Sequence, residues 1–320
     1  MSVLSAVIPC FNEEESLPLF LSEFDNVCSR MKESWPNLSF EVVLVDDGST
    51  DDTLSIMKNA AGNSSYGFSI RWISFSRNFG KEAALYAGLQ HAKGDYVATM
   101  DADMQDPPSL LPQMYEILDT EDFDNVATRR KDRKGEPPIR SWFARQFYKL
   151  INHISKADIV DGARDFRLMK RPVVDAILTM GEYNRFSKGI FGWVGFKTKW
   201  ISYENVDRVA GNSKWSFLRL FVYALDGIVA FSTTPLTIAS LLGILLCFIA
   251  LLMVIFIIVR TLTFGDPVAG WPSLICIVTF IGGVQLLSVG ILGQYLAKTY
   301  LETKHRPIYI VRMSGESSNE

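Results

Sequence analysis

The stretch "GDYVATMDADMQDPP", residues 94–108, places a cluster of acidic residues directly after a short apolar run. The apolar run ends at Asp101 and Asp103, a third carboxylate follows at Asp106, and Pro107 and Pro108 prevent a strand from continuing. Carboxylates this close together repel one another, so we expect bound positive charge to offset their repulsion. The stretch therefore predicts a buried strand that ends at a cation site.

Three earlier segments repeat this pattern of an apolar run that ends in polar residues. They are "LSAVIPCF" at 4–11, "SFEVVLVDD" at 39–47 and "SIRWISFS" at 69–76, and helix-like segments separate them. Strands that alternate with helices predict an α/β fold, a Rossmann-like and mostly parallel sheet with helices on both faces. Ligands bind at the carboxyl ends of such strands. The polar residues expected at that edge are Asn12, Glu13, Asp46, Asp47, Arg77, Asn78, Asp101 and Asp103.

Composition and missing motifs narrow the classes of function. The net charge is −3, from 32 basic and 35 acidic residues, so we expect no nucleic-acid partner recruited by bulk charge. The chain has no G-x-G-x-x-G and no Walker A loop, which argues against dinucleotide and P-loop chemistry. Its three histidines and four cysteines show no metal or disulfide spacing.

Two long segments carry no charged residue, 227–259 and 267–297. A transmembrane helix needs about 20 mostly apolar residues, so both segments predict membrane spans. Basic residues flank the pair on its outer sides, at Arg219, Lys298, Lys304 and Arg306. The positive-inside rule then predicts a two-span protein of the cell membrane with both termini in the cytoplasm. The first residues turn polar by Glu13, so we expect no signal peptide before the first strand.

Two further segments have the pattern of amphipathic helices. In "IRSWFARQFYKLINHIS", 139–155, apolar residues at helical spacing occupy one face and basic residues another. This pattern fits an interfacial helix on a membrane, and it equally fits a core-packing helix with a solvated basic face. The segment "SKWSFLRLFVYALDG", 213–227, directly before the first span, is a second interfacial candidate.

The acidic strand ends suggest specific chemistry. Mg²⁺ and Mn²⁺ prefer oxygen ligands and often combine one or two carboxylates with substrate phosphates, which suits Asp101 and Asp103. Gln105 is either another oxygen ligand or a turn residue, and we expect Asp106 to be a turn and helix-start residue. Helix capping is the expected role of the residues after the second strand, Ser49, Thr50 and Asp52.

The ordered motifs resemble one known family. The segments "VIPCFNEEESL", "VVLVDDGSTDDT", "SRNFGKEAAL" and "MDADMQDPP" resemble the inverting family 2 nucleotide-sugar glycosyltransferases, which have a GT-A type fold. The segments "GARDFRLMKRPVVDAI", "RFSKGIFGWVGF" and "RVAGNSKWS", with the two apolar segments, are similar to polyisoprenyl-phosphate glycosyltransferases. Within these the bactoprenol (undecaprenyl-phosphate) glucosyltransferases are most similar, and dolichyl-phosphate mannose synthases share the catalytic domain. The resemblance covers roughly residues 3–300.

The resemblance implies a role for each matching residue. A nucleotide sugar would be held by Pro9, Phe11, Glu13, Asp46, Asp47, Lys81 and Asp101. A metal, Mg²⁺ or Mn²⁺, would bind at Asp101, Asp103 and Gln105, and the catalytic residues would be Asp165 and Asp103. The acceptor or diphosphate would contact Arg129, Arg140, Arg208 and Lys214. A serine usual four residues after the arginine matching Arg140 is Ala144 here, which puts one phosphate contact in doubt.

Together these features predict metal-dependent, inverting transfer of a hexose, glucose from UDP-glucose, to undecaprenyl phosphate at the cytoplasmic membrane face. UDP-GlcNAc, UDP-galactose and GDP-mannose stay open as donors, a self-associating homo-oligomer stays open, and for Asp165 an ion pair with Arg164 or Arg167 is the structural alternative. A processive polysaccharide synthase or a silent membrane scaffold is less consistent with two spans and an intact acidic edge.

The expected parts are a catalytic domain at 1–212, a juxtamembrane helix at 213–232, spans at 233–260 and 272–298, an external loop at 261–271 and a cytoplasmic tail at 299–320.

Overall fold

The computed structural model describes residues 2–130, 160, 162–203, 229, 232–264 and 270–317. The chain divides into two compact units. The first combines Met1–Ala224 with Arg306–Glu320, and the second is Leu225–His305. The second unit is therefore inserted between two parts of the first along the chain.

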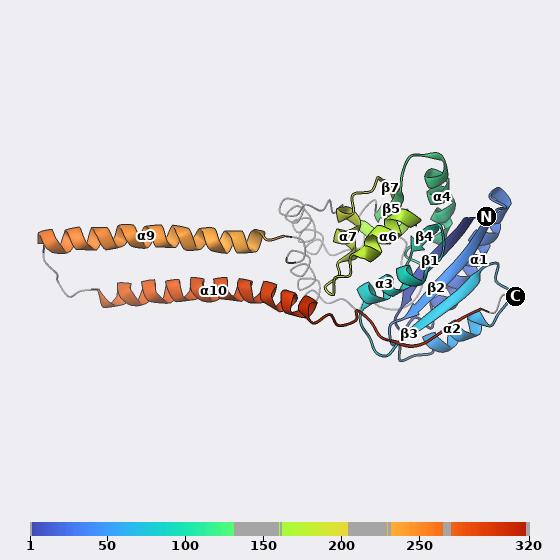
Figure 1. Cartoon of the computed structure of the whole chain (residues 1–320), viewed down its shortest axis with the longest axis horizontal. Coiled ribbons are helices and arrows are strands. Elements are labelled where there is room, and N and C mark those ends of the chain that lie inside the picture. The colour runs from blue at the N-terminus through green and yellow to red at the C-terminus, as the bar shows by residue number, and fades with distance from the viewer. Residues whose placement is uncertain are drawn as a thin grey trace. The chain divides into compact units, whose positions relative to one another are not determined.

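The first unit is built on one sheet in which the described strands follow the order β7-β5-β6-β4-β1-β2-β3-β8 (Figure 1). Strands β4, β1, β2 and β3 are parallel neighbours, whereas β6 is antiparallel to both β4 and β5. The strand bounds are β1 Ser2–Cys10, β2 Leu38–Asp46, β3 Ser69–Phe75, β4 Tyr96–Thr99, β5 Asn125–Arg130, β6 Ala163–Lys170, β7 Thr198–Tyr203 and β8 Val311–Glu316.

Helices cover both faces of this sheet. Ile8 and Leu44 pack into the main core with helix α1, whereas their neighbours Val7 and Val45 face Gly88 of helix α3. A Cβ at Gly88 would lie 2.2 Å from Val7 Cγ1, so glycine permits the close approach of α3. The helix bounds are α1 Leu17–Ser34, α2 Thr53–Ala61, α3 Lys81–His91, the 3₁₀ turn η1 Pro108–Leu110, α4 Leu111–Thr120, α6 Arg171–Thr179 and α7 Ser187–Trp193.

The α/β fold predicted from the sequence is confirmed, and the sheet extends beyond the four predicted strands. The most distant addition in sequence is β8, which pairs antiparallel with β3. Arg71 Nη2 lies 2.9 Å from Glu316 Oε2 across this pair, and the Tyr309 ring stacks on Phe75 with centroids 4.9 Å apart. Part of the segment expected to be a cytoplasmic tail is thus a strand of the sheet in the first unit.

The second unit contains two long apolar helices, α9 Thr234–Phe264 and α10 Trp271–Thr303. Within them, Thr234–Met253 and Phe280–Thr303 are long and apolar enough to cross a membrane. Large apolar side chains such as Leu241, Phe256 and Leu286 are exposed along both helices, as a lipid-facing surface requires. The two apolar segments predicted from the sequence are therefore helices. The predicted amphipathic segments 139–155 and 213–227 lie entirely outside the described residues.

Candidate functional site

The carboxyl ends of the parallel strands meet at one edge of the sheet, as predicted. Asp46 is in register with Cys10 on β1 and with Ser74 on β3, and Val7 is in register with Thr99 on β4. The loops that follow these strands start from the same edge. The acidic residues of "VDDGST" and "MDADMQDPP" consequently belong to one site.

The first acidic pair at this edge, Asp46 and Asp47, is held by uncharged donors. Asp46 is 1% exposed and accepts hydrogen bonds from the Ser49 backbone N–H at 2.8 Å and from the Ser74 hydroxyl at 2.6 Å. Asp47, 3% exposed, accepts from the backbone N–H groups of Phe79 and Gly80 at 2.7 and 2.9 Å. Burial and the neighbouring Asp46 charge raise the pKa of Asp47 to about 6, although the two backbone hydrogen bonds oppose that shift.

The loops after β1 and β2 are tied together by side chains expected to cap a helix. The Asn12 N–H donates to Ser49 Oγ at 3.0 Å, and the Thr50 N–H donates to Asn12 Oδ1 at 2.9 Å. Asp52 precedes α2 but makes no capping hydrogen bond through its side chain. The capping prediction for these residues is wrong because the neighbouring β1 loop supplies closer partners.

Glycine is required where the loops after β2 and β3 cross. Gly48 has a φ of +70°, and a Cβ there would lie 2.6 Å from the backbone carbon of Arg77. Any side chain would therefore clash with main-chain atoms that cannot move aside. This close approach brings the Phe79 and Gly80 N–H groups within reach of Asp47.

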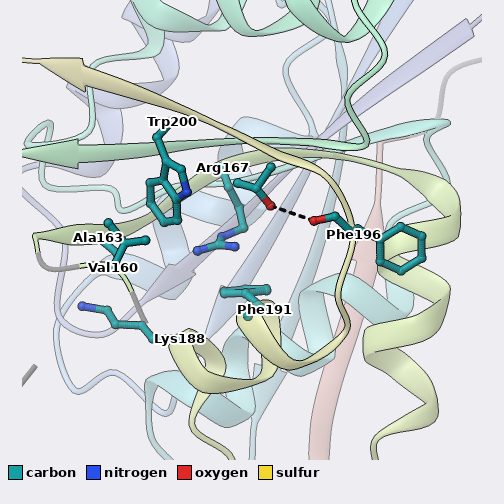
Figure 2. Close-up of a pocket in the computed structure, with 9 residues that line it drawn as sticks. Val160, Ala163, Arg167, Lys188, Phe191, Phe196 and Trp200 are labelled. Atoms are coloured by element: carbon teal, nitrogen blue, oxygen red, sulfur yellow. Dashed lines mark hydrogen bonds between the residues drawn. The ribbon is translucent and has the colours of Figure 1, made fainter. Parts of the chain in front are cut away.

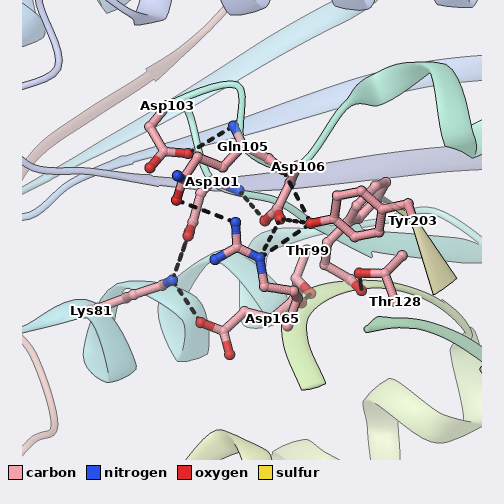
Figure 3. Close-up of polar contacts among 11 residues, drawn as sticks. Lys81, Thr99, Asp101, Asp103, Gln105, Asp106, Thr128, Asp165 and Tyr203 are labelled. Atoms are coloured by element: carbon pink, nitrogen blue, oxygen red, sulfur yellow. Dashed lines mark hydrogen bonds and ion pairs between the residues drawn. The ribbon is translucent and has the colours of Figure 1, made fainter. Parts of the chain in front are cut away.

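The second acidic group is organised around a lysine (Figure 3). Lys81 Nζ lies 2.7 Å from Asp101 Oδ1 and 2.6 Å from Asp165 Oδ2, so one ammonium bridges the ends of β4 and β6. Burial alone would raise the pKa of Asp165, but the positive charges of Lys81, Lys188 and Arg167 hold it well below its usual range. Asp165 thus stays ionised at neutral pH, and its ion-pair partner is Lys81, whereas the structural alternative from the sequence is Arg164 or Arg167.

The oxygen atoms near Asp101 fit a divalent cation. Asp103 Oδ1 accepts a hydrogen bond from the Gln105 N–H at 3.1 Å, across a turn in which Met104 has a φ of +60°. Asp101 already forms an ion pair with the ammonium of Lys81, which shows that this carboxylate attracts positive charge. Within the described residues no three His, Cys, Asp or Glu side chains gather around one point. A metal here would thus need oxygen ligands from its substrate in addition to the two carboxylates.

Asp106 is a buried carboxylate, and its expected role as a simple turn residue is wrong. It is 1% exposed and accepts a hydrogen bond from the Tyr203 hydroxyl at 3.0 Å. Arg164 Nε lies 3.3 Å from Asp106 Oδ1, and Arg164 Nη2 also donates to Gln105 Oε1 at 3.3 Å. Burial and the nearby Asp101 charge raise the pKa of Asp106 to about 6, against the opposing effect of Arg164. This network fixes the loop that carries Asp101 and Asp103.

Some of the remaining predicted site residues lie at the same edge of the sheet, and others lie outside the described part of the chain. Pro9 lies within β1, Phe11 and Glu13 lie in the loop after it, and the Glu13 N–H donates to Thr53 Oγ1 at 2.8 Å. Arg129 lies on β5 with an exposed side chain whose Nε donates to Ser202 Oγ at 2.9 Å. Three further predicted residues lie outside the described part of the chain: Arg140, Arg208 and Lys214.

Glu82 is a site residue that the sequence did not single out. Its carboxylate accepts a hydrogen bond from the Ser187 N–H at 2.9 Å and a second from the Ser187 hydroxyl, so it attaches α7 to α3 beside Lys81. Burial raises the pKa of this carboxyl above its usual range. The only signal in the sequence is its position next to Lys81, because its partner lies more than a hundred residues away.

Comparison with known proteins identifies the family. A model of glycosyl transferase family 2 matches residues 5–178. The prophage bactoprenol glucosyl transferase homolog of Escherichia coli strain K12 is 40% identical, over 97% of this chain and 98% of its own. The bactoprenol glucosyl transferase of Shigella phage SfV is 42% identical over the same shares. The family match over more than half of the chain, with relatives aligned along nearly all of it, shows that this chain is a glycosyltransferase of family 2.

Proposed function

We propose that this glycosyltransferase moves glucose from UDP-glucose to undecaprenyl phosphate, with inversion at the anomeric carbon and with Mg²⁺ or Mn²⁺ bound. The observation that carries the proposal is the Lys81 bridge between Asp101 and Asp165. It brings a carboxylate suited to a cation and an ionised, half-buried carboxylate to the same end of the sheet. The names of the bactoprenol relatives support the choice of donor and acceptor.

The donor would lie along the carboxyl edge of the sheet. Pro9, Phe11, Glu13, Asp46 and Asp47 would surround its base and ribose. Asp101 and Asp103 would hold the metal together with the diphosphate, and Gln105 Oε1 retains a second lone pair for it beside Arg164. The chemistry that a bound Mg²⁺ or Mn²⁺ supplies is neutralisation of the diphosphate leaving group. Lys81, relieved of Asp101, would remain beside Asp165 and donate to the diphosphate.

The acceptor needs little activation. A lipid monophosphate is already anionic at neutral pH, so one of its oxygens can bond to the anomeric carbon as the bond to the UDP oxygen breaks. UDP leaves with that electron pair, and no proton has to be removed from a dianionic phosphate. Asp165, kept ionised by Lys81, would stabilise positive charge that develops at the anomeric carbon or orient the acceptor.

The apolar helices α9 and α10 give this chemistry a membrane setting. A polyprenyl phosphate keeps its chain in the bilayer, so an enzyme that uses it gains from being anchored there. We infer that the catalytic unit is cytoplasmic, because basic residues flank the apolar pair on its outer sides.

A donor and acceptor assay of the full chain in detergent or membranes tests the proposal. We expect UDP release from UDP-glucose only when undecaprenyl phosphate and Mg²⁺ or Mn²⁺ are present, with equal glucose incorporated into lipid. Parallel reactions with UDP-GlcNAc, UDP-galactose and GDP-mannose should be slower. Faster turnover with one of these would identify that nucleotide sugar as the donor in place of UDP-glucose. Donor binding without any turnover would support a membrane scaffold instead of an enzyme.

A further inference from the structure

A cavity of about 200 Å³ is lined by residues of β6, α7 and β7, among them two cations and two aromatic rings (Figure 2). Arg167 of β6 and Lys188 of α7 supply the positive charge. Phe191 and Trp200 supply aromatic rings on either side of the Arg167 side chain, whereas the Phe196 ring is directed away from it. Figure 2 shows the Arg167 side chain directed into the space between Trp200 and Phe191. The combination suits a ligand that is anionic at one end and apolar at the other.

Within the described part of the chain, Arg167 is a buried cation that lacks a full set of partners. Its side chain is 2% exposed, and its Nε has no hydrogen-bond partner among the described residues. The guanidinium carbon lies 3.5 Å from the centroid of the Phe191 ring, a cation–π contact that satisfies no N–H group. Burial lowers the pKa of Arg167 to about 9, with Asp165 opposing the shift. A buried, under-bonded guanidinium is costly unless an anion completes its hydrogen bonds.

The other arginine of the strand provides an internal contrast. Arg164 donates to Tyr203 and Gln105 and lies 3.3 Å from Asp106, so its guanidinium is paired within the protein. Arg167 lies two residues after Asp165, and alternate residues of a strand share a face. Ala163 and Arg167 both line the cavity, so the strand places Asp165 between two lining residues on the same face.

We propose that this cavity receives the phosphate end of the polyprenyl acceptor, with Arg167 and Lys188 as its anion ligands. Phe191 and Trp200 then contact the first isoprene units. This assignment rests on the proposed function and adds two cations to Arg129 and Arg140, which the family resemblance predicts for the same phosphate. The two cations would hold the phosphate as a dianion beside Asp165, where an oxygen of it bonds to the anomeric carbon as UDP departs.

Steady-state kinetics of two variants test this site in the full chain. We expect Lys188→Met and Arg167→Met to raise KM for undecaprenyl phosphate about tenfold or more, with KM for UDP-glucose changed less than about twofold. Lys197→Met is the matched control, because Lys197 pairs with the exposed Asp122 outside the cavity. Arg167→Met can fail to fold, so the half-buried Lys188 carries the test in that case. An unchanged KM for the lipid phosphate in Lys188→Met overturns the assignment.

Thermal unfolding with small probes separates the possible sources of the anion. Farnesyl phosphate should raise the Tm of the unmodified chain more than inorganic phosphate does, farnesol should not raise it, and Lys188→Met should abolish the gain. Equal stabilisation by inorganic phosphate and farnesyl phosphate would show a plain phosphate site and overturn the lipid assignment. Absence of transfer by the unmodified chain would instead contradict the proposed function, which the kinetics of that chain report separately.

Discussion

Two groups of acidic residues lie at one edge of the sheet, the first at the end of β2 and the second at the ends of β4 and β6, and they are neutralised in opposite ways. Asp46 and Asp47 receive hydrogen bonds from the Ser74 hydroxyl on β3 and from backbone N–H groups of the adjoining loops. Asp101 and Asp165 share the ammonium of a single lysine. The first group is complete without a ligand, whereas the second is balanced by a cation that another cation can replace.

The two kinds of partner indicate different roles for these carboxylates: one pair holds the loops in place, and the other pair can exchange its partner for a ligand. Backbone donors are fixed by the fold, so Asp46 and Asp47 hold the β2 and β3 loops in place. A lysine side chain is long and 38% exposed here, so its contacts can be exchanged when a metal and diphosphate arrive. Substitutions in the first group should therefore change mainly the stability of the fold, and substitutions in the second group should change transfer and metal binding.

The largest effect is expected at Asp165. Asp165→Asn removes the charge that would face the anomeric carbon, and transfer should fall by about three orders of magnitude or more. UDP binding, measured by titration calorimetry, should stay within about threefold of the unmodified chain. Loss of UDP binding together with turnover would assign Asp165 a structural role instead.

Asp103→Asn should be the next most severe change. It removes one of the two carboxylates offered to the metal, so transfer in membranes should fall about a hundredfold or more, and Mn²⁺ binding followed by electron paramagnetic resonance should weaken. Asp103→Glu is the matched variant that keeps the charge and should retain more Mn²⁺ affinity. Normal turnover in Asp103→Asn would contradict the metal site.

Lys81→Met distinguishes the two groups through stability. Without the ammonium, Asp101 and Asp165 repel each other, and the metal-free chain should lose about 1–3 kcal/mol of unfolding free energy in EDTA. Added Mn²⁺ should restore part of that loss. The matched control is Ser74→Ala, which removes the hydroxyl donor to Asp46 at a cost of about 1 kcal/mol that Mn²⁺ does not restore. Equal Mn²⁺ responses in both variants would erase the proposed distinction.

The smallest expected effect is a pH dependence at Asp47. Its pKa is raised from 3.8 to about 6, so the folded state binds a proton more tightly than the unfolded state does. The resulting stability is complete below about pH 4 and is lost as pH rises through 6. Asp47→Asn should therefore gain about 1–2 kcal/mol relative to the unmodified chain between pH 4.5 and 7.5, measured by denaturant unfolding. A pH-independent difference would show that Asp47 is not protonated in this range.

Local patterns predicted the strand-end carboxylates because an apolar run and the acidic residues after it are contiguous in the sequence. The Asp101 and Asp103 positions followed from "VATMDAD" alone, and the four-strand core followed from repetition of that pattern. The residues that contact the strand-end carboxylates could not be predicted from the sequence. Lys81 and Asp165 are 84 residues apart, and Asp106 and Tyr203 are 97 apart, so only the folded sheet brings them together.

The same reason explains why several strands were missed. Strands β5, β6 and β7 form the part of the sheet with mixed direction, where no repeat of strand and helix marks them. Strand β8, "VRMSGE", is polar and follows a long apolar helix, so its sequence is typical of a tail. Its pairing with β3 depends on an open sheet edge that the sequence of β8 does not reveal.

That late strand has a consequence for how the protein is made. Ribosomes synthesise the chain from its N-terminus, so β3 is finished long before Val311–Glu316, which cover it. Throughout the synthesis of α9 and α10 the nascent catalytic unit carries an open edge at β3, which is the kind of edge on which chains aggregate. A ribosome that stops between α10 and β8 would release a product with both apolar helices and an uncovered sheet. Such a product is a natural client for chaperones and membrane proteases.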